Sequence, residues 1–162
     1  MHTISEPVFK KEKELEKTIG KAITFILSQN ANIVDFFAFH GRFDLCVLIH
    51  NNRKVTYTRF IEVKHFSRAN SRIGLNGAQV DLLIHNSEDL LWLNKHITWI
   101  FGDSTKAKGS NRFQMLNNVQ AKGCVYNKVR RGKQNNFSLK KVMEAPLFWN
   151  ELLKELNRFL VE

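Results

Sequence analysis

The spacing of apolar residues over residues 9–101 constrains the fold more than any other feature of the sequence. Apolar residues recur at helical spacing from about Phe9 to Ser28, with charged residues on the other face. Three stretches rich in β-forming residues follow, at Ile33–Phe39, Phe43–His50 and Lys54–Phe66. A second helical pattern then runs from Asn76 to about Leu93, and Ile97–Phe101 predicts a short buried strand. This order predicts a mixed α/β fold with a central sheet flanked by helices.

The second half of the chain is strongly basic. The formal net charge of the chain is +10, and no Asp or Glu occurs between Ser104 and Met143. That stretch contains ten cations: Lys106, Lys108, Arg112, Lys122, Lys128, Arg130, Arg131, Lys133, Lys140 and Lys141. A long segment of one sign that is interleaved with apolar residues favours a folded surface for a polyanion, of which nucleic acid is the commonest. The alternative is a solvated basic face.

The same segment predicts further β-structure and a final helix. Strands are expected at Arg112–Val119 and Gly123–Arg131, with a turn at Arg131-Gly132-Lys133. Pro146 suits the first turn of a helix that runs over about residues 146–161. We therefore expect a single domain over residues 1–162. It comprises a core at about 9–101, a basic segment at about 104–143 and the C-terminal helix.

The location of the protein follows from what the sequence lacks. No apolar run is long enough to span a membrane, and the N-terminus has no secretory pattern. Cys46 and Cys124 show neither disulfide-framework nor zinc-site spacing. We expect a cytoplasmic protein with no membrane partner.

Three charged residues of the predicted hairpin carry the first chemical hypothesis. Glu62 and Lys64 are two apart in a strand, so they point to one face amid large apolar residues. Asp44 opens the preceding strand, and the turn is expected near Asn51-Asn52. A two-residue loop would place Asp44 on the other face, whereas a three-residue loop gives it the face of Glu62 and a five-residue loop sets it directly opposite Glu62. We therefore predict an odd-length loop, or a bulge that restores the parity.

Two carboxylates at this separation suit a hard divalent cation, Mg²⁺ first, with Mn²⁺ as a substitute. Such an ion can lower the pKa of a bound water and stabilise charge on a phosphate. Lys64 can position the attacking water or neutralise the developing charge. The alternative interpretation is a surface salt bridge between Lys64 and Glu62 or Asp44.

The motif resembles that of the PD-(D/E)XK nuclease superfamily. Seventeen residues separate Asp44 of Gly-Arg-Phe-Asp44 from Glu62 of Ile-Glu62-Val-Lys64. Phe43 stands where the name-giving Pro would stand, at a position that varies in the superfamily. The resemblance implies a restriction-endonuclease-like core of helix, strand hairpin, helix and strand. It covers a little over half of the chain.

The resemblance also implies two further site residues. The first helix often adds a Glu, and Glu12, Glu14 and Glu16 are the candidates. We favour Glu16, at the edge of the core-facing stripe, as a metal ligand beside Asp44 and Glu62, with Glu12 in reserve. Some members carry a Gln on the next helix, where Gln79 stands. Gln79 would equally complete a capping box with Asn76.

Several cations and histidines are candidates for DNA contact. Arg68 and Arg72 follow the predicted strand that carries Glu62 and Lys64, and they are expected to line the path by which DNA enters the site. A basic hairpin is expected to grip the backbone with Lys128, Arg130, Arg131 and Lys133. His40 and His65 flank the motif, and either can contact phosphate.

The functional expectation is a metal-dependent endonuclease acting on duplex or branched DNA. A restriction-type or other site- or structure-specific enzyme comes first, and a Holliday-junction resolvase or a homing endonuclease comes next. The alternative from another class is a non-catalytic DNA-binding protein. Since two cuts in a duplex usually require two active sites, we also expect a homodimer.

Overall fold

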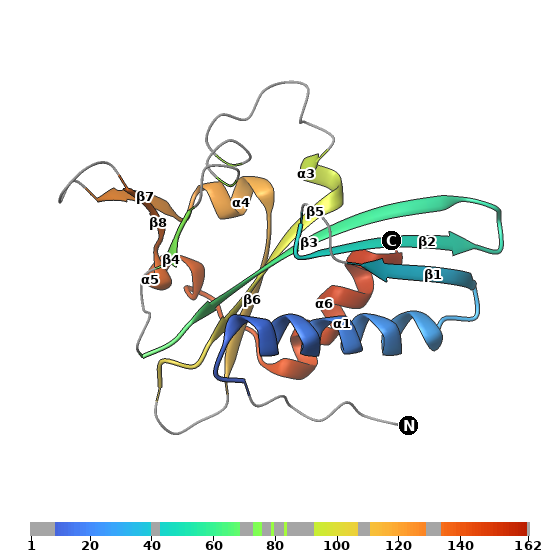
Figure 1. Ribbon diagram of the computed structural model, residues 1–162, viewed down its shortest axis with the longest axis horizontal. Coiled ribbons are helices and arrows are strands. Elements are labelled where there is room, and N and C mark those ends of the chain that lie inside the picture. The colour runs from blue at the N-terminus through green and yellow to red at the C-terminus, as the bar shows by residue number, and fades with distance from the viewer. Residues whose placement is uncertain are drawn as a thin grey trace.

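The structure is a computed structural model that describes residues 9–39, 43–68, 73–75, 79, 83, 93–106, 111–128 and 134–161. It is an α/β fold (Figure 1). The helices are α1 (Glu12–Ser28), α3 (Leu93–His96), α4 (Asn118–Lys122), α5 (Leu139–Val142) and α6 (Trp149–Val161). The strands are β1 (Ile33–Phe39), β2 (Leu45–Asn51), β3 (Thr56–Phe66), β4 (Ile73–Gly74), β5 (Ile97–Asp103), β6 (Arg112–Asn117), β7 (Val125–Lys128) and β8 (Gln134–Phe137).

The main sheet is mixed. Its strand order is β1-β2-β3-β5-β6, with β3 and β5 parallel and the other neighbours antiparallel. A second sheet has the order β4-β8-β7 and lies on the opposite side of the main sheet from α1 and α6 (Figure 1). The predicted central sheet flanked by helices is therefore confirmed at this level.

Two apolar clusters lie on the two faces of the main sheet. Ile61 and Val63 of β3 pack with buried residues of α1 and α6. Trp99 and Phe101 of β5 pack with Phe66 and with residues of α4, α5 and β8. Because side chains alternate along a strand, Glu62 and Lys64 point away from the cluster that holds Ile61 and Val63.

Several predicted boundaries moved. The first helix begins at Glu12 rather than near Phe9, because Lys11 is extended at its N-cap. The strand predicted to reach Val119 ends at Asn117, whose side chain forms a capping box with Gln120 and starts α4. Here a local side-chain cap overrides strand propensity.

Two further differences arise from pairing between distant segments. Strand β4 lies between the strand predicted to end at Phe66 and the helix predicted from Asn76, because Ile73 and Gly74 pair with Phe137 and Asn136 of β8. The C-terminal helix begins at Trp149 rather than at Pro146, because Leu147 forms an antiparallel bridge with Phe113 of β6. The predicted turn at residues 131–133 lies outside the described residues, as does most of the helix predicted over 76–93, within which Gln79 and Leu83 are helical.

Within the described part of the chain, no helix combines the length and the apolar character needed to cross a membrane.

Candidate active site

The hairpin of β2 and β3 sets the geometry of the site. Its last pair is His50 with Thr56, so the five residues 51–55 form the connection. This confirms the predicted odd-length loop. The Asn51 side chain accepts hydrogen bonds from the backbone N–H of Arg53 and of Val55. Lys54 takes a positive φ of 63°, so the left-handed position falls on a lysine and not on Asn51 or Asn52.

In this register Asp44 lies opposite Glu62. Each of the two carboxylates accepts a hydrogen bond from a backbone N–H on the other side of the hairpin. The Asp44 backbone N–H donates to Glu62 Oε1 at 3.0 Å, and the Val63 N–H donates to Asp44 Oδ2 at 2.8 Å. Among the described residues, the pairing of β2 with β3 ends at Leu45 with Ile61. The Asp44 carboxylate thus satisfies a backbone donor that β2 no longer reaches.

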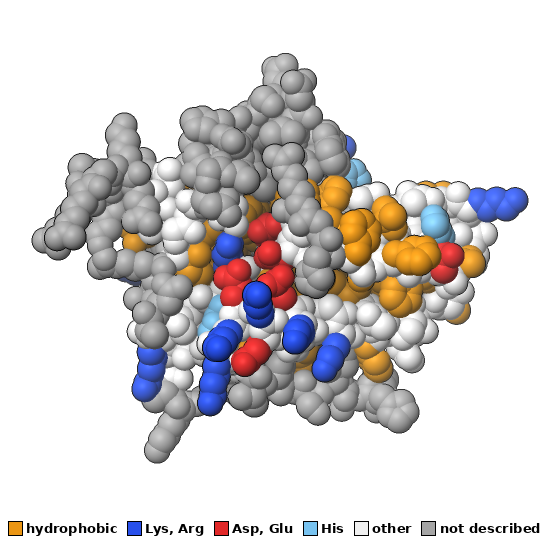
Figure 2. All heavy atoms as spheres, viewed as in Figure 1, with side chains coloured by type: hydrophobic (Ala, Val, Ile, Leu, Met, Phe, Trp, Pro, Cys, Tyr) orange, Lys and Arg blue, Asp and Glu red, His pale blue; other side chains and the backbone are white. Residues whose placement is uncertain are grey.

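Helix α1 brings two glutamates to the same place. One carboxylate oxygen from each of Glu12, Glu16 and Asp44 lies within 4.8 Å of the others. Glu12 Oε1 also lies 3.9 Å from Lys64 Nζ, and only 12% of the Lys64 side chain is exposed. Figure 2 shows acidic side chains gathered near the middle of the visible face, above the first part of α1.

Two glutamates of α1 therefore reach the site, whereas the sequence suggested only one. Glu16 joins Asp44 as expected, and Glu12 joins as well, one turn earlier. Glu14 is exposed and its Oε2 accepts a hydrogen bond from the Lys10 backbone N–H at 2.6 Å, so it does not contribute to this cluster.

The electrostatics of the site reflect crowded carboxylates. Burial first and nearby Asp44 second raise the pKa of Glu62 to about 7, against lowering by the Asp44 N–H, Lys64 and Gln79. Burial likewise raises the pKa of Glu12, which Lys64 lowers and Asp44 raises. The carboxylates of Glu12, Glu16 and Asp44 thus lie together, Glu62 is bonded to the backbone of Asp44, and Lys64 is the ammonium beside Glu12. This excess of hard oxygen donors fits a divalent cation such as Mg²⁺.

Gln79 also belongs to the site. It is buried, and its Nε2 donates to Glu62 Oε2 at 3.4 Å. The structure thus brings Gln79 to Glu62, as the resemblance implied. The capping-box interpretation involves Asn76, which lies outside the described residues.

The predicted DNA contacts are mostly beyond the described structure. Arg68 is exposed, with its Nε donating to the Thr105 carbonyl at 3.1 Å. The other predicted contacts, namely Arg72, Arg130, Arg131, Lys133 and the side chain of Lys128, lie outside the described residues. Among the ten cations of the basic segment, Arg112 forms an ion pair with buried Asp103, which gives it a structural role.

His40 lies outside the described residues, whereas His65 is buried. The His65 Nε2 lies 2.6 Å from Ser104 Oγ, and its ring packs edge-on against Phe9. The expectation that His65 contacts phosphate is therefore wrong. Strand alternation places it on the face opposite Lys64.

A row of exposed lysines, which the sequence reading did not single out, lies along α1 and just before it. Lys13, Lys17 and Lys21 are on the helix, and Lys10 precedes it. Their spacing of three and four residues places them on one face of a helix, which was the available signal. In Figure 2, basic side chains flank the acidic cluster along α1.

No protein-family model, curated protein or solved structure matches this chain.

Proposed function

We propose that this protein is a metal-dependent nuclease that hydrolyses phosphodiester bonds in DNA. The observation that carries the proposal is the convergence of Glu12, Glu16 and Asp44 within 4.8 Å, beside buried Glu62 and Lys64. These residues come from three separate places in the chain: α1, the residue just before β2 and the second half of β3. A surface salt bridge would need one carboxylate, and this site has four.

The resemblance to the PD-(D/E)XK superfamily supports the same function. A helix, a strand hairpin, helical residues at Gln79 and Leu83, and a strand parallel to β3 follow one another in the order expected of that core. Asp44 precedes the second strand, and Glu62 and Lys64 share one face of the third. The first-helix glutamate and the later glutamine also reach the site.

The carboxylates of Asp44, Glu12 and Glu16 would hold Mg²⁺, with Glu62 adjoining them. The ion, when bound, supplies Lewis-acid stabilisation of phosphate charge and a water of lowered pKa. Lys64 stands with its ammonium beside Glu12, where it can orient a water or offset negative charge on the scissile phosphate. Gln79 and the Asp44 N–H fix the Glu62 carboxylate, and Glu62 in turn fixes the backbone that carries Asp44.

The proposed substrate is inferred from the distribution of charge. A basic second half and a lysine row beside the acidic site favour DNA, duplex or branched. We expect an endonuclease of restriction type, or another site- or structure-specific cutter, acting as a homodimer. A resolvase or a homing endonuclease would use the same site. A non-catalytic DNA-binding protein has no use for four carboxylates facing DNA, because they repel phosphate unless a cation is bound.

Incubation with supercoiled plasmid, single-stranded DNA and a four-way junction tests the proposal. Cleavage is expected in Mg²⁺ or Mn²⁺, none in EDTA, and none by Asp44→Asn. Glu151→Gln, which removes an exposed carboxylate on α6, is the matched control and should cut like the wild type. Cleavage in EDTA, or unchanged cleavage by Asp44→Asn, would overturn the metal mechanism. DNA binding with no cleavage in either metal would establish the non-catalytic alternative.

A further inference from the structure

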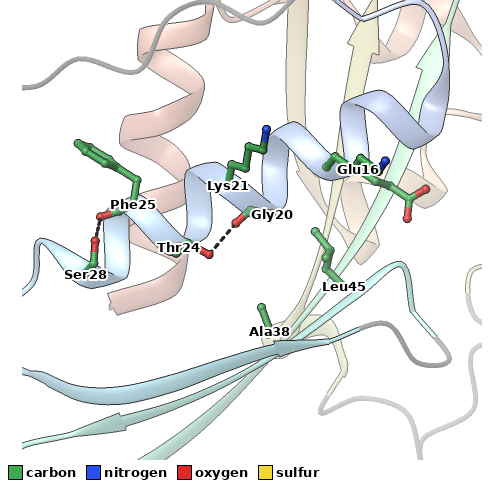
Figure 3. Close-up of a pocket in the computed structure, with 9 residues that line it drawn as sticks. Glu16, Gly20, Lys21, Thr24, Phe25, Ser28, Ala38 and Leu45 are labelled. Atoms are coloured by element: carbon green, nitrogen blue, oxygen red, sulfur yellow. Dashed lines mark hydrogen bonds between the residues drawn. The ribbon is translucent and has the colours of Figure 1, made fainter.

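An open groove of about 630 Å³ runs between α1 and the strands β1 and β2. Figure 3 shows α1 as one wall, with Ala38 of β1 and Leu45 of β2 across from it. Glu16 lies toward one end of the helix wall and Ser28 toward the other. The groove has the volume of a small-molecule pocket, so it can take a narrow chain but no double helix.

The groove begins at the acidic cluster. Glu16 lines it and also contributes one of the carboxylates that meet Asp44. From Glu16 to Ser28 the helix rises about 18 Å, which matches roughly five nucleotides of one B-form strand. A polymer whose reacting group lies on the acidic cluster can therefore continue along the groove.

Gly20 keeps the groove open. A glycine inside a helix costs about 0.5–1 kcal/mol relative to alanine. Among the described residues, a Cβ at Gly20 would meet Leu45 Cδ2 alone, at an ordinary distance of 4.0 Å, so packing there does not require a glycine. Any side chain that stabilised α1 at position 20 would also project into the groove.

The charges at the groove suit a polyanion. Lys17 and Lys21 line it, and both are exposed. The hydroxyls of Thr24 and Ser28 donate back to the helix carbonyls of Gly20 and Phe25 (Figure 3), so the cationic donors of this wall are the lysines. The opposite wall, at Ala38 and Leu45, is apolar and suits sugars and base edges. A cationic groove that follows the backbone is how proteins hold single polynucleotide strands.

We propose that this groove seats one strand of the nucleic acid substrate next to the scissile phosphate, with Lys17 and Lys21 on its backbone phosphates. The inference rests on the proposed nuclease function and adds to it a path for the substrate. It assigns positioning roles to Gly20, Lys17 and Lys21.

Filling the groove is the first test. Gly20→Gln places a good helix former in it, and Thr18→Gln places the same side chain on α1 outside it. Both variants should melt no lower than the wild type. For a 5′-labelled single-stranded oligonucleotide in EDTA, Gly20→Gln should raise Kd roughly tenfold, and kcat/KM for DNA cleavage should fall by a similar factor. Thr18→Gln should stay within about twofold of the wild type.

Removing the charge is the second test, and it stands even if Gly20→Gln fails to fold. The double variant Lys17→Gln/Lys21→Gln should lower the slope of log Kd against log salt by about 1.4 on a single strand. The control pair Lys95→Gln/Lys154→Gln removes two exposed lysines away from the groove and should leave the slope unchanged.

The two proposals fail in different ways. If the wild type neither binds nor cuts any DNA tested, the nuclease function is wrong. If the wild type cuts DNA but Gly20→Gln behaves like Thr18→Gln, the groove is not the strand path. Equal loss from the two lysine pairs would likewise refute it, because that result indicates a general effect of net charge.

Discussion

Replacing Glu62 by Gln should make the metal-free protein more stable at alkaline pH while removing its activity. Only 6% of Glu62 is exposed, and its pKa is raised to about 7 by burial first and by Asp44 second. Glutamine keeps the size and shape of the side chain. Its oxygen can still accept from the Asp44 N–H, and the Gln79 amide can turn over to accept from the new amide group.

The magnitude follows from the pKa of Glu62 in the two states. The ordinary value is 4.5 and the folded value is about 7, which corresponds to about 3 kcal/mol. A raised carboxyl pKa means that the folded state holds the proton more tightly. The contribution is therefore fully present below about pH 4.5 and is lost as the pH rises through about 7. Between about pH 5 and pH 8 the wild type should lose about 2.5 kcal/mol that the variant keeps.

Urea unfolding in EDTA measures this difference directly. With an m-value of about 2 kcal/mol/M, the wild-type midpoint should fall by about 1 M urea between the two pH values. The Glu62→Gln midpoint should fall much less, and the exposed-site control Glu151→Gln should follow the wild type. Mg²⁺ should restore stability to the wild type at alkaline pH, because an ion that binds only the folded state stabilises it. A wild-type midpoint that does not change with pH would refute the reasoning.

Three further predictions concern single side chains. Lys64→Ala should lower kcat for DNA cleavage by about 10²–10³-fold, and a variant that still cuts at the wild-type rate would remove Lys64 from the chemistry. Gly102→Ala should destabilise the protein by about 1–3 kcal/mol in urea unfolding, because its Cβ would lie 2.6 Å from Leu15 Cδ2; a neutral effect would mean that α1 shifts freely on the sheet. Asp103→Asn should cost about 2 kcal/mol in the same assay by leaving the partly buried Arg112 without its carboxylate, and the cost should vanish in an Arg112→Leu background.

The hairpin was the part of the site that the sequence predicted best, because two constraints acted on it together. Strand alternation fixes which residues share a face, and Asp44 had to share the face of Glu62 for the chemistry to work. That requirement limited the loop to odd lengths. It did not choose five over three, because the choice depends on the Asn51 side chain capping two backbone donors while Lys54 adopts a positive φ.

The contribution of α1 was harder to predict for a physical reason. Helical periodicity places Glu12 and Glu16 on neighbouring positions of one face but says nothing of which turn meets the sheet edge. That depends on where the helix starts and on how it docks beside Asp44, both set by distant contacts. The basic segment shows the same limit, since β4 pairs with β8 across about sixty residues of sequence and Arg112 is engaged by Asp103.

Some residues of this protein cost folding free energy where they stand, and the structure explains only some of these costs. Lys54 has a positive φ, but the hydrogen bonds of its turn account for it. Gly102 lacks a side chain because Leu15 and Phe9 pack against its backbone. The cost at Glu62 is only partly offset, because the Asp44 N–H, Lys64 and Gln79 lower its pKa but leave it at about 7 beside a second carboxylate. Gly20 weakens a helix that has room for a methyl group. Asp44 and Glu16 connect Glu62 to Gly20, since Asp44 bonds to Glu62 and meets Glu16, which lines the groove beside Gly20. Two such costs on one continuous surface are what a bound cation and a bound strand would explain together.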